Sequence, residues 1–280
     1  MTYKSKKLDY IVNLIYNFLI YKIFLLFLGR KEDEKLFKKD IEKIKNKILN
    51  MLKENYKNYE IRKECLSLLH EGQFANAAVF RYNDGNNLDI TIKDFSGSSW
   101  LVRKTLGRIF VNIEGHTMMK LENNPSITKG VVFLSPCTLA FNFIKGKAIK
   151  EFQEKEIPKD FFITLEKNVK EMHRRNIVHL DLRNLGNVIM SKEGYPYIID
   201  FQSCISTKHL PKKLRKILRA SDLTGVYKCW NRRCSEPLDE ERQEFFNEFQ
   251  KIRKLWVLKG YPVQRFIRHT KEKFSQKKSR

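Results

Sequence analysis

The stretch that decides the fold runs from residue 177 to residue 202 and reads IVHLDLRNLGNVIMSKEGYPYIIDFQ. It contains two short apolar runs, 188–190 and 197–199, which are separated by a turn of Lys, Glu and Gly. Short apolar runs around such a turn are typical of two paired β-strands. Asn187 precedes the first strand and Asp200 follows the second, so pairing of the two strands brings these side chains together.

The polar residues of this stretch are those that transfer of a phosphoryl group from ATP requires. The reaction needs a carboxylate near the attacking hydroxyl group, which Asp181 can supply. It also needs Mg²⁺ beside the phosphates, and Mg²⁺ prefers oxygen ligands such as the amide of Asn187 and the carboxylate of Asp200. A helix is predicted directly upstream, over residues 160–175. The order helix, loop and hairpin therefore predicts an ATP- and Mg²⁺-dependent phosphotransferase.

A lysine ends a predicted strand further upstream. Three short antiparallel strands are expected between residues 66 and 93, and the last alternates apolar and polar residues up to Lys93. Its ammonium group could bind the α- and β-phosphates of ATP if a carboxylate holds it in place. The predicted helix 103–121 offers Glu114 as this partner. The alternative is that both residues are surface charges, which is the usual location of Lys and Glu.

The segment between the first two predicted strands partly matches a glycine-rich phosphate-binding loop. Where the pattern G-x-G-x-x-G-x-V has its fixed residues, this chain has Gly72, Phe74, Ala77 and Val79. Glycines let backbone N–H groups approach the phosphates, so the loss of two of them predicts a looser or reshaped cover. The predicted ATP-binding residues are Gly72, Val79, Lys93 and Glu114.

Together these motifs resemble the protein-kinase-like superfamily over about residues 66–228. The chain looks most similar to small bacterial members related to RIO-type kinases and to the lipopolysaccharide (Kdo and heptose) kinases. The resemblance implies that Asp181 is the catalytic base and that Arg183 contacts the γ-phosphate. It also implies that Asn187 and Asp200 bind Mg²⁺. By the same resemblance, Lys93 binds phosphate and Glu114 holds it, while His179 packs under Phe201 in a structural role.

Several features depart from the common kinase pattern. Asp181 and Asn187 are six residues apart instead of five, and no Ala-Pro-Glu motif follows. Gln202 stands where Gly is usual, which predicts a less mobile activation segment. Asp222 is weakly similar to an Asp that anchors the catalytic loop from a later helix. These departures allow a small-molecule or glycolipid acceptor as well as a protein.

The predicted fold class is α+β, a two-lobed protein-kinase-like fold with an N-terminal helical extension. The extension covers residues 1–62, the N-lobe with its sheet and one helix covers 63–146, and the mostly helical C-lobe with a basic tail covers 147–280. Within the extension, residues 32–56 have apolar residues at helical spacing. This amphipathic helix is expected to dock on the next domain or to form a coiled coil.

The chain is strongly basic, with 55 Lys and Arg against 32 Asp and Glu and a net charge of +23. Such a charge predicts an anionic partner: nucleic acid, an acidic membrane surface or a phosphorylated substrate. The basic, amphipathic residues 208–219 would lie beside the acceptor in a kinase, although they could equally form a solvated surface helix. The predicted partners are ATP and an anionic glycolipid, sugar or protein acceptor, and an anionic membrane surface is a further candidate. Nucleic acid is less favoured.

Residues 8–28 are almost continuously apolar and just long enough to span a bilayer. Asp9, Asn13 and Asn17 recur every four residues, which favours a helix in the membrane plane or one packed on the protein. A buried structural helix is the alternative. Because ATP is cytosolic, the predicted location is the cytoplasm, at the inner face of the cytoplasmic membrane. Five cysteines without a CxxC pair indicate reduced thiols.

Three functional hypotheses follow from these features. The first is a membrane-associated kinase that phosphorylates a hydroxyl group of a sugar, a lipid-linked glycan or a protein Ser/Thr. The second is a RIO-like protein kinase or ATPase whose basic surface meets RNA or ribosomes. The third is a non-catalytic pseudokinase scaffold, which the reduced glycine loop and Gln202 suggest, and against which the retained Lys93, Asp181, Asn187 and Asp200 argue.

Overall fold

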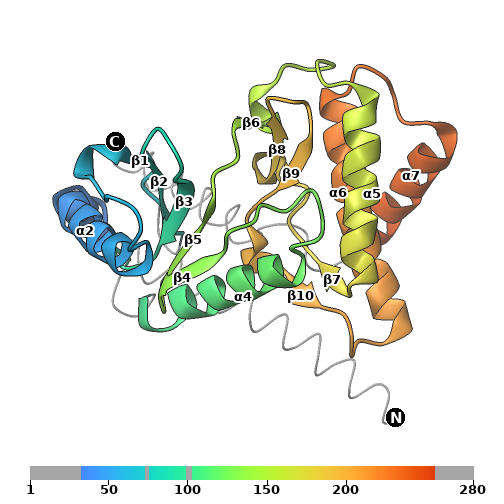
Figure 1. Ribbon diagram of the computed structural model, residues 1–280. Coiled ribbons are helices and arrows are strands. Elements are labelled where there is room, and N and C mark those ends of the chain that lie inside the picture. Colours follow the sequence, from blue (N-terminus) through green and yellow to red (C-terminus); the bar gives the residue numbers. More distant parts are fainter. Residues whose placement is uncertain (1–32, 73–75, 99–102, 256–280) are drawn as a thin grey trace, which may run out of the picture. The chain divides into compact units, whose positions relative to one another are not determined.

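The computed structural model describes residues 33–72, 76–98 and 103–255. The chain divides into two units, Met1–Pro237 and Leu238–Arg280. Along the first unit, a part built around a sheet is followed by a mostly helical part (Figure 1). This is the α+β class that the sequence predicted.

The sheet of the first part has five antiparallel strands in the order β1-β2-β3-β5-β4. The strands are β1 (Leu66–His70), β2 (Ala78–Asn83), β3 (Asp89–Asp94), β4 (Val132–Ser135) and β5 (Thr138–Asn142), and the 3-10 helix η1 (Lys63–Cys65) precedes them. Lys93 of β3 pairs with Val79 on one side and with Leu139 on the other. Because side chains alternate along a strand, Lys93 and its neighbour Ile92 face opposite sides of the sheet.

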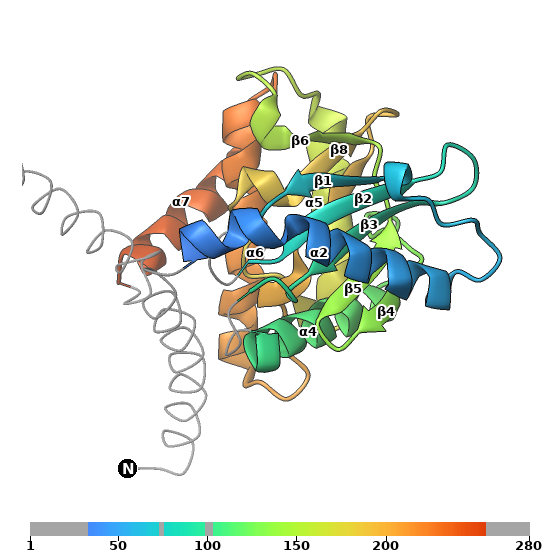
Figure 2. The ribbon, with the colours of Figure 1, turned by 90° about the vertical axis from the view of Figure 1, so that its left-hand side faces the viewer.

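The helix α2 (Asp33–Asn55) covers the Ile92 face of this sheet (Figure 2). Its residues Ile48 and Leu52 are fully buried in one apolar cluster with Phe80 and Ile92 of the sheet. The sequence left open whether this amphipathic helix docks on the next domain or forms a coiled coil. The helix α2 docks on the sheet. The sheet therefore buries apolar side chains on the face opposite to that of Lys93.

The helix α4 (Leu106–Lys120) packs on the Lys93 face of the sheet. Gly115 marks its closest approach, because a Cβ at this position would lie 2.3 Å from the ring of Phe133 and 3.0 Å from the side chain of Leu139. The absence of a side chain at Gly115 thus lets the helix pack closely on the sheet. Its neighbour Glu114 is thereby directed at the end of β3.

The second part of the first unit is built on two helices, α5 (Lys159–Arg174) and α6 (Lys212–Arg233). They pack together through Phe162 and Trp230, whose rings stack with centroids 5.5 Å apart. The short elements around them are β6 (Gly146–Ala148), η2 (Ile149–Glu151), β7 (Ile177–Val178), η3 (Leu185–Asn187), β8 (Val188–Ser191), β9 (Pro196–Ile198), η4 (Phe201–Ser203) and β10 (Ile205–Ser206). They form two small sheets, β6-β8-β9 and β10-β7. The predicted hairpin is the pair β8–β9.

The second unit contains the helix α7 (Glu240–Leu255). Within the described part of the chain, we find no helix with both the length and the hydropathy needed to cross a membrane. The apolar segment 8–28 and the residues from 256 onward, which include the basic tail, lie outside the described residues, so the predictions about them stay predictions. All five cysteines are free.

Candidate active site

The first half of the candidate site is an ion pair between Lys93 and Glu114. The Nζ atom of Lys93 donates to Oε1 of Glu114 at 2.7 Å, and the two side chains are only 9% and 2% exposed. The strand β3 delivers the lysine and the helix α4 delivers the carboxylate. The pairing expected from the sequence is therefore present, and the alternative of two surface charges is wrong. Whether the pair binds ATP is a separate prediction.

The electrostatics of this pair keep the lysine charged. Burial alone would lower the pKa of Lys93, but the carboxylates of Asp200 and Glu114 outweigh it and raise the pKa above the ordinary 10.5. Burial also raises the pKa of Glu114, while the ammonium group of Lys93 opposes this rise. The neighbouring carboxylates therefore favour the charged form of Lys93, although its side chain is only 9% exposed.

Asp200 connects this pair to the second part of the unit. Its Oδ1 atom lies 3.2 Å from Nζ of Lys93, and its side chain is 37% exposed. The residue has a left-handed backbone with φ of 68°, which is unusual for a non-glycine residue. The next residue, Phe201, donates its backbone N–H to Oε1 of Glu114 at 3.3 Å. One carboxylate oxygen thus binds both the lysine and the backbone beside Asp200.

Asp181 and Asn187 lie together in a segment that we call the Asp181 loop (residues 179–187). The amide Nδ2 of Asn187 donates to Oδ2 of Asp181 at 2.8 Å and to its backbone oxygen at 3.1 Å. The backbone N–H of Ile199 donates to the oxygen of Asn187 at 3.0 Å, at the start of the β8–β9 pair. The hairpin therefore places Asn187 and Asp200 at the same end, as the sequence predicted.

The carboxylate of Asp222, on α6, holds the start of the Asp181 loop. It accepts the backbone N–H groups of His179 at 2.7 Å and Leu180 at 2.8 Å, and it lies 3.0 Å from Nε2 of His173. Leu180 has a left-handed backbone with φ of 67°, so these bonds stabilise a strained turn. The weak sequence similarity at Asp222 therefore marks a real contact between a later helix and the loop.

His179 packs as a structural residue, in agreement with the prediction. Its ring lies against that of Phe201 with centroids 5.1 Å apart, and its Nε2 atom is 3.1 Å from the backbone oxygen of Ile199. Gln202, which replaces the usual Gly, is buried. The segment after Asp200 is thus packed against the Asp181 loop.

The helix α6 makes a second contact with the Asp181 loop, at Arg183, which the sequence did not indicate. Nη1 of Arg183 donates to the backbone oxygen of Thr224 at 3.4 Å, and Nζ of Lys228 donates to the backbone oxygen of Arg183 at 2.9 Å. A Cβ at Gly225 would lie 2.9 Å from the backbone of Leu182, so only glycine fits this crossing without a shift. These contacts join residues about 40 positions apart, and no local motif signals them. The contact of Arg183 with a γ-phosphate stays a prediction.

The glycine-loop residues are described in part. Gly72 has φ of 69°, and its N–H donates to Nδ1 of His70 at 2.9 Å. A Cβ at Gly72 would lie 2.3 Å from the backbone oxygen of Ala77, so a side chain does not fit there. Val79 lies beside Lys93 in the sheet register. Phe74 lies outside the described residues, and the roles of Gly72 and Val79 toward ATP stay predictions.

The donor set suits Mg²⁺. Asp200 offers a partly exposed carboxylate and Asn187 an amide oxygen at the same end of a hairpin, and Mg²⁺ prefers such oxygen ligands. Within the described ranges no group of three or more His, Cys, Asp and Glu side chains gathers at one point. A two-ligand site of this kind leaves positions for phosphate oxygens and water, as is usual for Mg²⁺ bound with a nucleotide.

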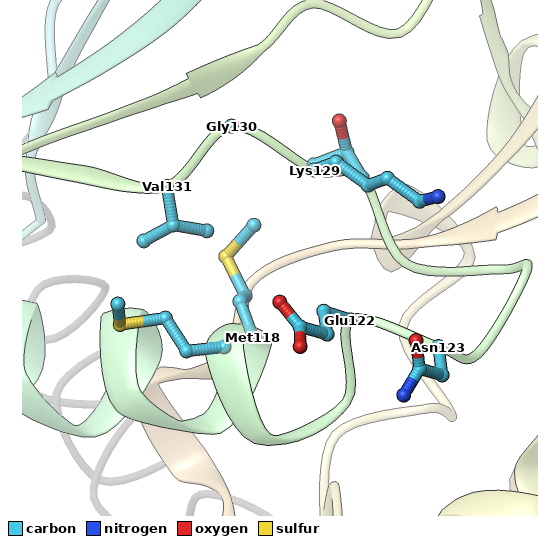
Figure 3. Close-up of a pocket in the computed structure, with 8 residues that line it drawn as sticks. Met118, Glu122, Asn123, Lys129, Gly130 and Val131 are labelled. Atoms are coloured by element: carbon cyan, nitrogen blue, oxygen red, sulfur yellow. The ribbon is translucent and has the colours of Figure 1, made fainter.

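A separate pocket of ≈ 390 Å³ lies between the end of α4 and the segment before β4 (Figure 3). Its lining includes Met118, Met119, Glu122 and residues 128–131. None of the predicted site residues lines it. The pocket is therefore distinct from the candidate active site.

Comparisons with known proteins give likeness of structure alone. No protein-family model matches the chain, and no curated protein sequence matches it. Among solved structures, the chain is similar to the Rio2 kinase from Chaetomium thermophilum, with 14% identity and a TM-score of 0.49, over 63% of this chain and 60% of that one. For the ADP/Mg²⁺-phosphoaspartate complex of that kinase the TM-score is 0.47, with 14% identity over 63% of this chain and 59% of that one.

This chain thus matches about three fifths of the length of those proteins. Because neither TM-score reaches 0.5, the α+β fold class rests on the elements themselves. The first part is a five-stranded antiparallel sheet with the helix α4 inserted between β3 and β4 and joined to the sheet by a buried Lys–Glu pair. A mostly helical second part follows it.

Proposed function

We propose that this protein is an ATP-dependent phosphotransferase that transfers the γ-phosphate to a hydroxyl group, with Mg²⁺ as its cofactor. The observation that carries the proposal is the position of Lys93, whose ammonium group lies 2.7 Å from Glu114 and 3.2 Å from Asp200. This lysine joins the sheet, the helix α4 and the hairpin that presents Asn187 and Asp200. One connected network therefore contains the residues with expected roles at the site, which are Lys93, Glu114, Asp181, Asn187 and Asp200.

In this proposal the buried pair positions the nucleotide. Lys93 binds the α- and β-phosphates, and Glu114 fixes the lysine side chain because its carboxylate lies buried on α4. Asp200 and Asn187 hold Mg²⁺, which neutralises charge on the phosphate oxygens when it is bound. Gly72, between β1 and β2, and Val79, which pairs with Lys93 in the sheet, are expected to cover the nucleotide.

Asp181 acts on the acceptor. Its carboxylate is oriented by the amide of Asn187 at 2.8 Å, and its loop is held by Asp222. The hydroxyl oxygen of the acceptor forms the new bond to the γ-phosphorus, and the bond between that phosphorus and the bridging oxygen of ATP breaks. The hydroxyl proton passes to Asp181, and ADP leaves with the bridging oxygen.

The surroundings of the Asp181 loop support an anionic acceptor. Two cations lie at this loop: Arg183, which belongs to it, and Lys228, whose Nζ donates to the backbone oxygen of Arg183 at 2.9 Å. The segment between η4 and α6 is short, and its strand β10 pairs back onto β7. Together, the cations and the short segment favour a sugar or glycolipid acceptor with a negative group. A protein Ser/Thr is the other candidate. The proposed location is the inner face of the cytoplasmic membrane.

Transfer of label from γ-labelled ATP tests the proposal. The protein and Mg²⁺ are added to a lysate of the source cells, and the products are separated into lipid, glycan and protein fractions. Asp200→Asn removes a proposed metal ligand with little change of shape. Asp160→Asn, at an exposed position in the first turn of α5, is the matched control.

Label in one fraction that is lost with Asp200→Asn and kept with Asp160→Asn would support the proposal and identify the acceptor class. Label that is unchanged by Asp200→Asn would contradict the assigned site. Label in no fraction, together with no binding of Mg²⁺ and ATP at millimolar concentration, would favour the pseudokinase scaffold.

A further inference from the structure

The Asp181 loop contains one residue more than the common spacing, and the structure shows how this residue is accommodated. Residues 185–187 form the 3-10 helix η3, and Asn184 is its N-cap. Oδ1 of Asn184 accepts the backbone N–H of Gly186 at 3.0 Å, and its backbone oxygen accepts that of Asn187 at 3.0 Å. A single tight turn thus absorbs the additional residue, and the side chains of Asp181 and Asn187 still meet.

The other end of the Asn184 amide makes a second contact. Its Nδ2 atom donates to Oδ1 of Asn187 at 3.2 Å. Asn187 is therefore bound on both sides, because its own Nδ2 donates to Asp181 while its Oδ1 accepts from Asn184. If the Asn187 amide were turned over, its oxygen would face the carboxylate of Asp181. Its N–H₂ group would face the N–H₂ group of Asn184. Both contacts would then be repulsive, so the network determines the orientation.

We propose that Asn184 is a positioning residue for the metal site, which holds Oδ1 of Asn187 toward bound Mg²⁺. This inference rests on the proposed function. A carbonyl-type oxygen has two lone pairs, so a donor on one of them leaves the other for a cation. Partners of this kind orient metal ligands, and their loss typically reduces metal affinity by about 10- to 100-fold. Because Asn184 is exposed, we expect an effect near the lower limit.

The cap and the contact with Asn187 use different atoms of Asn184, and one substitution separates them. A serine is also a good N-cap, because its hydroxyl oxygen can accept the N–H of Gly186. Its side chain is shorter and has no amide to donate to Asn187. Asn184→Ser therefore keeps the turn and removes the proposed function of the residue.

The chain offers a matched control in the turn between β2 and β3. There Oδ1 of Asn83 accepts the backbone N–H of Gly85 at 2.9 Å, which is the same kind of hydrogen bond as that between Asn184 and Gly186. This turn lies in the sheet and contains none of the proposed ligands. Asn83→Ser therefore reports what the same substitution does in a turn of this kind without a metal site.

The test measures the affinity of the protein for Mn²⁺ in the presence of a non-hydrolysable ATP analogue. Electron paramagnetic resonance monitors the binding. We expect Asn184→Ser to weaken Mn²⁺ binding about tenfold, and Asn83→Ser to leave it unchanged. Asn187→Ala should weaken it at least as much as Asn184→Ser. Melting temperatures of the two serine variants should stay close to that of the wild type, since each keeps its cap.

Different outcomes would refute the proposed function and the role of Asn184. If the wild type binds no Mn²⁺ with the nucleotide, the proposed function fails and this inference fails with it. If the wild type binds Mn²⁺, Asn187→Ala abolishes binding and Asn184→Ser binds like the wild type, the proposed function stands and the role of Asn184 is refuted. An equal loss with Asn83→Ser would also refute it.

Discussion

The two halves of the candidate site are built in opposite ways. Lys93 and Glu114 are 9% and 2% exposed and come from the interior of a strand and a helix. Asp200 is 37% exposed, and Asp181 lies in a loop whose backbone is held by Asp222. The first half is a buried ion pair that is expensive to disturb, because each charge depends on its partner. In the second half, which we call the open half, the carboxylates of Asp181 and Asp200 are partly exposed, so they can meet a metal ion and an acceptor.

Because of this difference, substitutions in the two halves should affect stability and activity separately. A change in the buried half should damage both the fold and nucleotide binding. A change of an open carboxylate should damage the chemistry and leave the fold nearly intact.

The largest effect is expected for Asp181→Asn. The substitution keeps the shape of the side chain but removes the group that accepts the hydroxyl proton, so the rate of transfer should fall about a thousandfold. The measurement is the initial rate with the acceptor that the labelling experiment identifies, together with the melting temperature. A variant that is as fast as the wild type would remove Asp181 from the mechanism, and a large loss of melting temperature would show that the open half also supports the fold.

Lys93→Met should have the largest effect on stability. It leaves the buried carboxylate of Glu114 without its partner, which should lower the free energy of unfolding by about 3–5 kcal/mol. Unfolding in urea measures the change, and Asp200→Asn serves as the comparison from the open half. If the two substitutions cost the same, the contrast between the halves would not hold.

The pH dependence of Lys93→Met sharpens this prediction. Burial raises the pKa of Glu114 above the ordinary 4.5, and the variant loses the ammonium group that opposes the rise. The folded variant therefore binds a proton more tightly than the unfolded chain, so its stability decreases as the pH rises through the raised pKa. The stability deficit relative to the wild type should be larger at pH 8 than at pH 5. A deficit that does not change with pH would mean that Glu114 is not its cause.

Asp222→Asn tests how the open half is held. The carboxylate accepts two backbone N–H groups, and an amide in its place offers one oxygen and a repulsive N–H₂ group. We expect a loss of about 2 kcal/mol in the free energy of unfolding and a lower rate of transfer. Affinity for ATP should change less than the rate, because the Lys93–Glu114 pair is untouched. A variant that loses nucleotide affinity but keeps its rate would contradict this division.

Gly115→Ala tests how the close packing of α4 on the sheet holds the buried pair. A methyl group would meet the ring of Phe133 at 2.3 Å, so α4 must move away from the sheet, at a cost of about 1–3 kcal/mol. The movement carries Glu114 away from Lys93, and ATP affinity should fall as a result. Gly85→Ala is a control that destabilises without a clash: its positive φ adds backbone strain, but the methyl group has open space around it, so ATP affinity should not change. Unchanged ATP affinity in Gly115→Ala would show that the spacing of α4 does not matter.

The sequence predicted the parts of this molecule that depend on local pattern. The first three strands of the sheet, the helix with Glu114 and the β8–β9 hairpin were predicted, because alternation and spacing place residues within an element or between neighbouring ones. The packing of His179 under Phe201 was expected only from the family resemblance. Asp222 gave only a weak signal, and Gly225 and Lys228 gave none. Their contacts with the Asp181 loop depend on how α6 crosses it.

The same limit applies to the N-terminal helix and to Asn184. The amphipathic pattern of α2 predicted a buried face but could not choose its partner, which is the far face of the sheet. The six-residue spacing between Asp181 and Asn187 could be read as a departure, but not as a capped 3-10 turn. In both cases the missing information is which surfaces meet in three dimensions.

Calorimetric titration of ATP, with and without Mg²⁺, tests the central claim most directly. For the wild type the account predicts that Mg²⁺ strengthens ATP binding, that Asp200→Asn removes this gain, and that Lys93→Met weakens binding under both conditions. No binding of ATP by the wild type at millimolar concentration would contradict the account. The same gain from Mg²⁺ in Asp200→Asn as in the wild type would contradict it as well.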